Sequence, residues 1–184
     1  MLQNLDRAML LWTSVSFSCY FLNILMPAFS VINDNGFIWL LLGALMLLDK
    51  KMRKAGWMML LCIGLSYILG NLILKELVMR PRPFEQFGVS QLLISPPDDY
   101  SFPSGHTSSS FAAVTMLFLT KQKARTTAAV YALLISFSRV YLFVHFPSDV
   151  LLGAILGIAC AYITFAMFAC CKAPKQLYES IEIT

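Results

Sequence analysis

Long apolar stretches, each close to the length of a membrane-crossing helix, are the feature that most constrains the fold of this chain. A transmembrane helix needs about 20 mostly apolar residues. Four stretches meet or approach that length and a fifth is shorter: Ala55–Val78, Ser104–Thr120, Thr126–Phe143, Val150–Cys171 and Phe37–Leu48. The fifth could cross the membrane only if its span included polar residues before it, or if the bilayer were thin or the helix tilted. We therefore expect an all-α, polytopic transmembrane helical bundle of five or six spans.

Composition supports a membrane protein built as one unit. Hydrophobic residues make up 58% of the 184 residues and charged residues 13%, whereas soluble domains average roughly 45–50% and about 25%. We expect a single domain over residues 1–184, with a core at 55–171, an N-terminal region at 1–54 and a short cytoplasmic tail at 172–184. No cleavable signal pattern is expected. The cysteines have neither metal-ligand nor disulfide spacing: Cys19, Cys62, Cys160, Cys170 and Cys171.

The N-terminal segment Leu5–Ile32 mixes polar and apolar residues and contains Pro27. It could span the membrane, or it could break near Pro27 and lie along the interface as amphipathic pieces. We expect the interfacial arrangement.

Nine of the 14 basic residues fall in three short clusters: Lys50, Lys51, Arg53, Lys54; Lys121, Lys123, Arg125; and Lys172, Lys175. Counting spans places all three clusters on one side, which the positive-inside rule makes the cytoplasm. The other side receives the proline-rich loop Met79–Phe102, which cannot be one continuous helix. Its apolar residues Phe84, Phe87 and Leu92–Ile94 are expected to pack this loop down, although they could form a membrane entry gate.

Three segments should meet on that second side: KELVMRPRP from Lys75, PSGH from Pro103, and SRVYLFVHFPSD from Ser138. Taken singly, each has an ordinary explanation, because basic residues often end spans and Pro-Ser-Gly often starts helices. Together they gather Lys75, Arg82 and Arg139, three cations that would repel one another unless an anion sits among them. Arg80 has no partner in this pattern, and we interpret it as a surface charge.

Phosphate fits such a site, because guanidinium groups match its oxygens and lysine adds a point charge. The helix start at Ser104 and Gly105 adds unpaired backbone N–H groups. His145 lies four residues before Asp149, a carboxylate that can fix the imidazole tautomer and leave the other ring nitrogen free to attack phosphorus. His106, from another helix, can act as the general acid. Two histidines and one aspartate do not make a metal site, so we expect neither metal nor cofactor.

These three segments resemble the signature of the type-2 phosphatidic acid phosphatase superfamily, and they match it in order without a substitution over about residues 55–171. The resemblance implies that Lys75, Arg82 and Arg139 hold the phosphate with Ser104 and Gly105. It implies that His145 becomes a phosphohistidine oriented by Asp149, that His106 protonates the leaving group, and that no metal takes part. Many relatives have a clear extra span before the N-terminal region, which is not evident here.

Bacterial members of this size resemble phosphatases of undecaprenyl pyrophosphate or phosphatidylglycerophosphate, and a site on the extracytoplasmic side of the cell membrane favours the former. Phosphatidic acid is another candidate substrate. A lipid-to-lipid phosphotransferase, a transporter, or a structural protein with a decayed motif are the alternatives. The related vanadium haloperoxidases are soluble, unlike this chain. We expect the lipid bilayer and a lipid phosphate as partners and no nucleic acid. The oligomeric state is left open.

Overall fold

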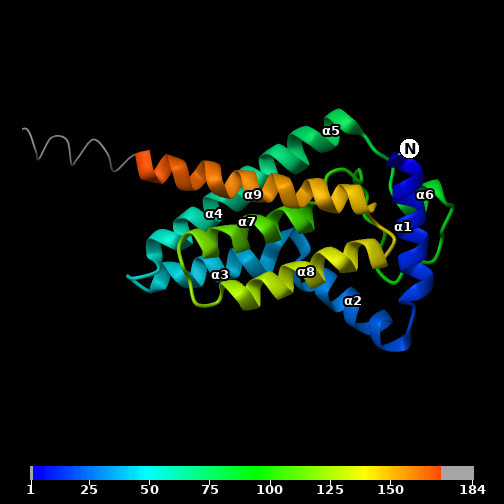
Figure 1. Ribbon diagram of the computed structural model, residues 1–184, viewed down its shortest axis with the longest axis horizontal. Coiled ribbons are helices and arrows are strands. Elements are labelled where there is room, and N and C mark those ends of the chain that lie inside the picture. The colour runs from blue at the N-terminus through cyan, green and yellow to red at the C-terminus, as the bar shows by residue number, and fades with distance from the viewer. Residues whose placement is uncertain (1, 171–184) are drawn as a thin grey trace, which may run out of the picture.

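The computed structural model describes residues 2–170, and this part of the chain is all-α. The elements are α1 (Leu2–Ser16), α2 (Tyr20–Ile32), the 3₁₀ turn η1 (Asp34–Gly36), α3 (Phe37–Leu48), α4 (Arg53–Tyr67), the π-helix η2 (Ile68–Leu74), α5 (Lys75–Val78), α6 (Pro83–Gln86), α7 (Gly105–Leu119), α8 (Arg125–Tyr141) and α9 (Pro147–Cys170). Helices α3, α4, α7, α8 and α9 run alongside one another, and α1 lies across one end of this bundle (Figure 1).

Helix α7 is the centre of the bundle, since it packs against α4, α8 and α9. A small residue of α9 lets the two helices come close: a Cβ atom added at Gly157 would lie 2.2 Å from the carbonyl oxygen of Ser108 in α7. Small residues allow helix backbones to approach in this way in membranes. The main apolar core joins Trp39, Met59, Met116 and Ile135 from four helices. The packing of α7 and α9 fixes where the first turns of both helices lie.

The expected all-α membrane fold agrees with the structure, but the count of five or six spans does not follow from it. Among residues 2–170, two stretches are long and apolar enough to cross a membrane, Arg53–Gln86 and Pro147–Cys170. The pair Tyr20–Ile32 and Asp34–Leu48, bent by 44°, adds a third if it is counted as one span. Helices α7 and α8 have 15 and 17 residues, roughly 22 and 25 Å, which is short of the ~30 Å hydrocarbon core. Five or six spans therefore stays a prediction.

The predicted break near Pro27 is wrong in position. Pro27 lies inside α2, and the chain instead breaks between Ser16 and Tyr20 and again at η1. Asn35 and Gly36 adopt left-handed backbone angles, with φ of 50° and 73°, which asparagine and glycine tolerate better than other residues do. These angles turn the chain from α2 into α3 and bring α2 beside the cavity described below.

Helix α1 is amphipathic, as an interfacial helix should be. Asp6, Leu10 and Thr13 are buried, whereas Trp12 and Val15 on its other face are exposed. Exposed apolar residues on such a helix are typical of one lying in the membrane interface. The interfacial position of α1 therefore stays our prediction.

The two ends of the bundle carry different loops. The α3–α4 and α7–α8 loops, with the first two basic clusters, lie at the end opposite α1 (Figure 1). The third cluster, Lys172 and Lys175, the rest of the predicted tail at 172–184 and Cys171 lie outside the described residues. Loop Met79–Phe102 lies at the α1 end, and its Phe84, Leu92 and Ile94 pack against the cluster of Met26, Tyr141, Leu142 and Val144. This contact favours the packing interpretation for these three residues, whereas Phe87 and Leu93 are exposed.

Candidate active site

A cavity of about 930 Å³ collects residues from all three sequence segments, and its lining extends from the loop Met79–Phe102 to Leu40 of α3 and Leu60 of α4. The predicted site residues that line it are Lys75, Arg82, Gly105, His106, Arg139 and His145. Ser104 and Asp149 are fully buried and lie behind its wall instead. The structure thus brings three cations and both histidines of the chain to one cavity.

His145 lies in the loop 142–146 between α8 and α9, and its tautomer is set by two neighbours. Its Nδ1 is 2.7 Å from the carbonyl oxygen of Ser101. Because a carbonyl only accepts, Nδ1 carries the hydrogen. Its Nε2 is 3.3 Å from Nη1 of Arg82, which only donates. The lone pair of Nε2 therefore points toward Arg82, one of the three cations that line the cavity.

The protonation state of His145 suits the same role. Burial lowers the pKa of His145 well below its usual value of 6.5, and the charges of Arg82, Arg139 and Lys75 lower it further. Both effects disfavour the charged imidazolium. A neutral imidazole keeps the lone pair that a nucleophile requires, so the protonation state of His145 is compatible with the predicted role.

Asp149 reaches His145 indirectly. Its Oδ2 is 3.9 Å from Nδ1 of His145, too far for the hydrogen bond that the sequence predicts. Instead Oδ2 accepts from the Ser101 hydroxyl at 2.5 Å and from the Phe146 N–H at 2.9 Å. Ser101 therefore joins the two residues, since its carbonyl holds His145 and its hydroxyl holds Asp149. The hydrogen bonds by which Asp149 can orient His145 therefore run through Ser101, which the sequence motif does not include, and through the backbone at Phe146.

Arg82 is 2% exposed and donates to the carbonyl of Val144 at 2.7 Å and to the carbonyl of Asp99 at 2.7 Å. The Asp99 carboxylate also accepts from both Lys75 and Arg82. Burial by itself would raise the pKa of Asp99, but the hydrogen bond and charge of Lys75, followed by those of Arg82, lower it to about 2. An ionised carboxylate thus occupies the position between two cations where we expected an external anion.

Arg139 and His106 meet at Ser30 of α2. Arg139 is 3% exposed and donates to the Ser30 hydroxyl, and its Nε has no hydrogen-bond partner among residues 2–170. The Nε2 of His106 is 3.2 Å from the carbonyl oxygen of Ser30, so it carries a hydrogen. The unpaired guanidinium N–H of Arg139 is a donor for an anion in the cavity, whereas the His106 N–H already donates to Ser30.

The start of α7 differs from the expectation for Ser104. Its hydroxyl lies 3.0 Å from that of Thr107 and accepts from the Thr107 N–H at 3.5 Å, so it caps the helix and does not face the cavity. The Ser104 N–H donates to the carbonyl of Asp149 at 3.1 Å, which ties the starts of α7 and α9 together. Gly105 does line the cavity, and a Cβ there would lie 2.9 Å from Oδ1 of Asn71.

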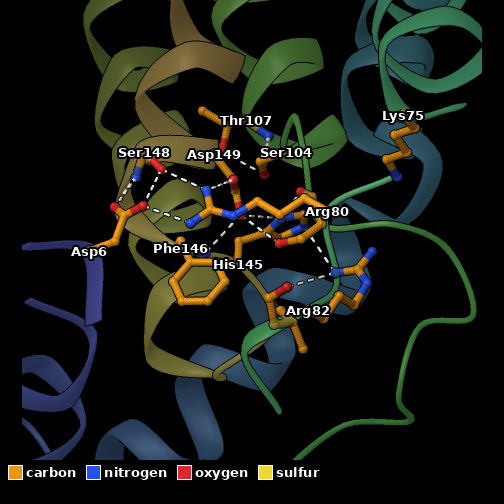
Figure 2. Close-up of polar contacts among 12 residues, drawn as sticks. Asp6, Lys75, Arg80, Arg82, Ser104, Thr107, His145, Phe146, Ser148 and Asp149 are labelled. Atoms are coloured by element: carbon orange, nitrogen blue, oxygen red, sulfur yellow. Dashed lines mark hydrogen bonds and ion pairs between the residues drawn. The ribbon is translucent and has the colours of Figure 1, made fainter. Parts of the chain in front are cut away.

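Our interpretation of Arg80 as a surface charge is wrong. Its side chain is 20% exposed and lies between two carboxylates, with Nη1 2.5 Å from Oδ1 of Asp149 and Nη2 2.8 Å from Oδ2 of Asp6 (Figure 2). The guanidinium also stacks over the Phe146 ring at 4.0 Å from its centroid. Sequence reasoning missed this pairing because Asp6 lies 74 residues away, with no motif connecting the two.

Asn71 is another residue that the motifs did not indicate. It lies on η2, lines the cavity, and its Oδ1 is buried without a hydrogen-bond partner in the described part of the chain. Buried polar groups are nearly always paired, and π-helical turns occur often at functional sites. The signal in the sequence is one polar residue in an apolar run, four positions before Lys75.

Comparison with known proteins agrees with this geometry. Residues 55–171 match the PAP2 superfamily, and they contain each of the three segments that form the cavity. The chain belongs to the PAP2 superfamily. The matched range has the same bounds as the core expected from the sequence. Asp6 and Ser30, two residues that contact the site, lie outside it.

Two proteins with similar sequences are named as lipid phosphatases. The chain is 36% identical over 122 residues to an undecaprenyl-diphosphatase of Sulfolobus acidocaldarius, covering 66% of this chain and 59% of that protein. It is 36% identical over 129 residues to phosphatidylglycerophosphatase B of Bacillus subtilis, covering 64% and 60%. The matches thus span about three fifths of these relatives.

A solved structure shares the fold over most of its length. It is the transmembrane PAP2-type phosphatidylglycerolphosphate phosphatase of Bacillus subtilis, with a TM-score of 0.73 and 30% identity. The match covers 91% of this chain and 86% of that one. The protein is accordingly a membrane protein with a transmembrane PAP2 fold.

Proposed function

We propose that this protein is a metal-independent phosphatase of membrane lipid phosphates that works through a phosphohistidine on His145. The observation that carries the proposal is the lone pair of His145 Nε2, which points at Arg82 in a cavity that Lys75 and Arg139 also line. A neutral nucleophile facing a set of cations suits attack on a phosphoryl group whose negative charge those cations bind.

Phosphate binding requires one rearrangement in the cavity. The Asp99 carboxylate, paired with Lys75 and Arg82, has to leave when a phosphate arrives with more charge. The Asp99 side chain is 52% exposed and belongs to the loop that precedes α7, so it can move toward solvent. Lys75, Arg82 and the free Nε of Arg139 then hold the phosphoryl oxygens, together with the backbone at Gly105.

The chemical step follows from the two histidines. The lone pair of His145 Nε2 forms a bond to phosphorus while the bond from phosphorus to the leaving oxygen breaks, and the electron pair stays on that oxygen. His106 gives its proton to the leaving oxygen as general acid. Water then attacks the phosphohistidine, His106 takes the proton from this water, and inorganic phosphate leaves with His145 neutral again.

For the substrate we propose undecaprenyl pyrophosphate, which would be converted to undecaprenyl phosphate at the outer face of the membrane. The undecaprenyl-diphosphatase relative supports this choice. So does the charge distribution, because the first two basic clusters lie at the end of the bundle opposite the cavity, which the positive-inside rule makes cytoplasmic (Figure 1). The lipid tail would lie in the bilayer beside the bundle.

Phosphatidylglycerophosphate is the second candidate, because the phosphatidylglycerophosphatase B relative is also 36% identical and the solved phosphatidylglycerolphosphate phosphatase shares the fold. Phosphatidic acid would present the same monoester to the cavity. Transfer of the phosphoryl group from His145 to a lipid acceptor would use the same first half of the reaction.

Phosphate release by the purified protein in detergent with EDTA tests these proposals together. We expect release that survives EDTA, and the fastest release from undecaprenyl pyrophosphate when it is compared with phosphatidylglycerophosphate and phosphatidic acid. Release that stops in EDTA would contradict the metal-independent route. A faster rate with either glycerophospholipid would replace the substrate, and no release from any of the three would contradict the phosphatase proposal.

A further inference from the structure

Arg80 lies between two buried carboxylates that come from distant parts of the chain. Asp149 in the first turn of α9 is 0% exposed, and Asp6 of α1 is 5% exposed. The Arg80 guanidinium contacts Oδ1 of Asp149 at 2.5 Å and Oδ2 of Asp6 at 2.8 Å, and its Nη1 donates to the Ser148 hydroxyl at 2.8 Å (Figure 2). The arginine thus connects α1, the loop after α5 and the start of α9.

Asp6 also caps α9 directly. Its Oδ1 accepts from the Ser148 N–H at 3.0 Å, and its Oδ2 accepts from the Ser148 hydroxyl. The first N–H groups of a helix have no partner within the helix, and a carboxylate there also meets the positive end of the helix dipole. A side chain of α1 therefore holds the first turn of the helix that carries Asp149.

These contacts lie behind the cavity wall. Asp6, Arg80 and Asp149 are not among its lining residues in the described part of the chain. They therefore act on the reacting phosphate only through other residues. The connection runs from Arg80 to Asp149, from Asp149 to the Ser101 hydroxyl at 2.5 Å, and from the Ser101 carbonyl to His145 Nδ1 at 2.7 Å.

We propose that Arg80 and Asp6 are positioning residues, which hold Asp149 and thereby His145 in place, so that α1 belongs to the catalytic unit. This inference rests on the proposed function. It extends beyond the PAP2 match, since Asp6 precedes residue 55. Arg80 and Asp149 form an ion pair, and removal of one partner leaves the other as an uncompensated buried charge.

The charge of Arg80 should be felt at His145, because Asp149 is 3.9 Å from Nδ1. Without Arg80, the unbalanced Asp149 carboxylate would favour a protonated His145, which cannot attack. The other charged or titratable groups around His145 stay unchanged in such a variant; they are Lys75 of α5, Arg82 and Asp99 of the following loop, Arg139 of α8 and His106 of α7.

The first test is the pH dependence of kcat/KM for Arg80→Gln and Arg80→Lys beside the unchanged protein. We expect the acid limb to move up by about one pH unit in Arg80→Gln and to stay in place in Arg80→Lys, which keeps the charge. KM should change little, because Arg80 does not touch the cavity. An unmoved acid limb in Arg80→Gln, or equal shifts in both variants, would overturn the proposal.

The second test uses Asp6, with Arg7 as the matched control. Arg7 is the next residue of α1, and its own contacts are with Gln86 at 3.3 Å and with the Phe87 ring. We expect Asp6→Asn to lower kcat by up to about 100-fold through misplacement of His145, and Arg7→Gln to leave kcat within about two-fold. The double variant Asp6→Asn/Arg80→Gln should be little worse than Arg80→Gln alone, because the two residues act as a unit.

The outcomes separate the two proposals. An unchanged protein that releases no phosphate would overturn the proposed function and the positioning role with it. An active protein in which Asp6→Asn equals Arg7→Gln, or in which the Asp6 and Arg80 effects simply add, would overturn the positioning role alone. If Arg80→Gln fails to fold, Arg80→Lys and Asp6→Asn still test the positioning role. The Asp6→Asn variant keeps the Arg80–Asp149 ion pair and removes only the connection to α1.

Discussion

At the scale of single residues, the arrangement around His145 determines its tautomer and its charge. The Ser101 carbonyl requires a hydrogen on Nδ1, and the Arg82 guanidinium requires a lone pair on Nε2. His106 likewise carries a hydrogen on the ring nitrogen that faces a carbonyl, that of Ser30. In the proposed mechanism, a neutral His145 needs no proton transfer before it attacks.

The pH dependence of kcat/KM tests this arrangement. Burial and the neighbouring cations lower the pKa of His145 well below 6.5, so the neutral form persists as pH falls through 6.5 and is lost only at lower pH. We expect the acid limb of kcat/KM to lie below pH 6.5. An acid limb at or above pH 6.5 that follows His145 would contradict the structure.

Asn71 should contact the bound phosphate through its amide NH2 group, because it lines the cavity and the NH2, unlike its unpartnered amide oxygen over residues 2–170, can donate to a phosphate oxygen. We expect Asn71→Ala to lower kcat/KM by about ten-fold, the loss of one hydrogen bond to a charged group. Ser66→Ala is the matched control: Ser66 on α4 also has an unpartnered buried oxygen but is not among the cavity-lining residues. Equal effects of the two substitutions on kcat/KM would remove Asn71 from the site.

Sequence reasoning located some site residues and missed others for one physical reason. Lys75, Arg82, His106, Arg139 and His145 stand in short motifs at the ends of apolar runs, and the bundle brings those ends together. Contacts made by tertiary structure alone leave no local pattern. The missed contacts are the pairing of Arg80 with Asp6, the bridge through Ser101, and the Asp99 carboxylate between two cations.

At the scale of helices, the close packing of α7 and α9 sets the geometry of the cavity. The Ser104 N–H at the start of α7 donates to the Asp149 carbonyl of α9, and Gly157 further along α9 meets the backbone of Ser108. Apolar runs predicted most helices close to their observed bounds. They could not predict the turns at Ser16–Tyr20 and η1, because Pro27 is tolerated within α2 and left-handed Asn35 and Gly36 make the bend.

Substitution of Gly157 tests the packing of these two helices. A Cβ at Gly157 would lie 2.2 Å from the Ser108 carbonyl oxygen and 2.8 Å from the Ala112 nitrogen. We expect Gly157→Ala to destabilise the fold by about 1–3 kcal/mol, as overpacking does, and to lower the Tm in detergent. Gly64→Ala is the control, since nothing lies within 4 Å of its added Cβ. A Tm for Gly157→Ala equal to that of Gly64→Ala would contradict the close contact.

At the scale of the whole molecule, the basic loops and the candidate active site lie toward opposite ends of the bundle. The first two basic clusters lie in loops at one end, and α1 and the loop Met79–Phe102 lie at the other (Figure 1). The cavity is lined in part by residues of the loop Met79–Phe102, among them Ile94 and Asp99. Composition and the positive-inside rule predicted this polarity. The number of spans was harder to predict, because an apolar run shows its length but not whether a short helix such as α7 crosses the bilayer or is enclosed by its neighbours.

Labelling of single cysteines in a cysteine-free variant tests the orientation. Ser95 lines the cavity, and Lys51 lies in the α3–α4 loop at the opposite end. We expect a membrane-impermeant maleimide added to intact cells to label Ser95→Cys and to leave Lys51→Cys unlabelled until the membrane is opened. The reverse pattern would place the cavity on the cytoplasmic side and would remove the support for undecaprenyl pyrophosphate at the outer face.

Trapping of the covalent intermediate tests the central claim most directly. The protein would be mixed with a lipid substrate labelled in its terminal phosphate, quenched in base within the first turnover, digested and analysed by mass spectrometry. We predict an acid-labile phosphoryl group on the peptide that carries His145 and none in His145→Ala, which should lose roughly 10⁴-fold or more in kcat. Label on another residue, or turnover by His145→Ala at a comparable rate, would contradict the phosphohistidine route.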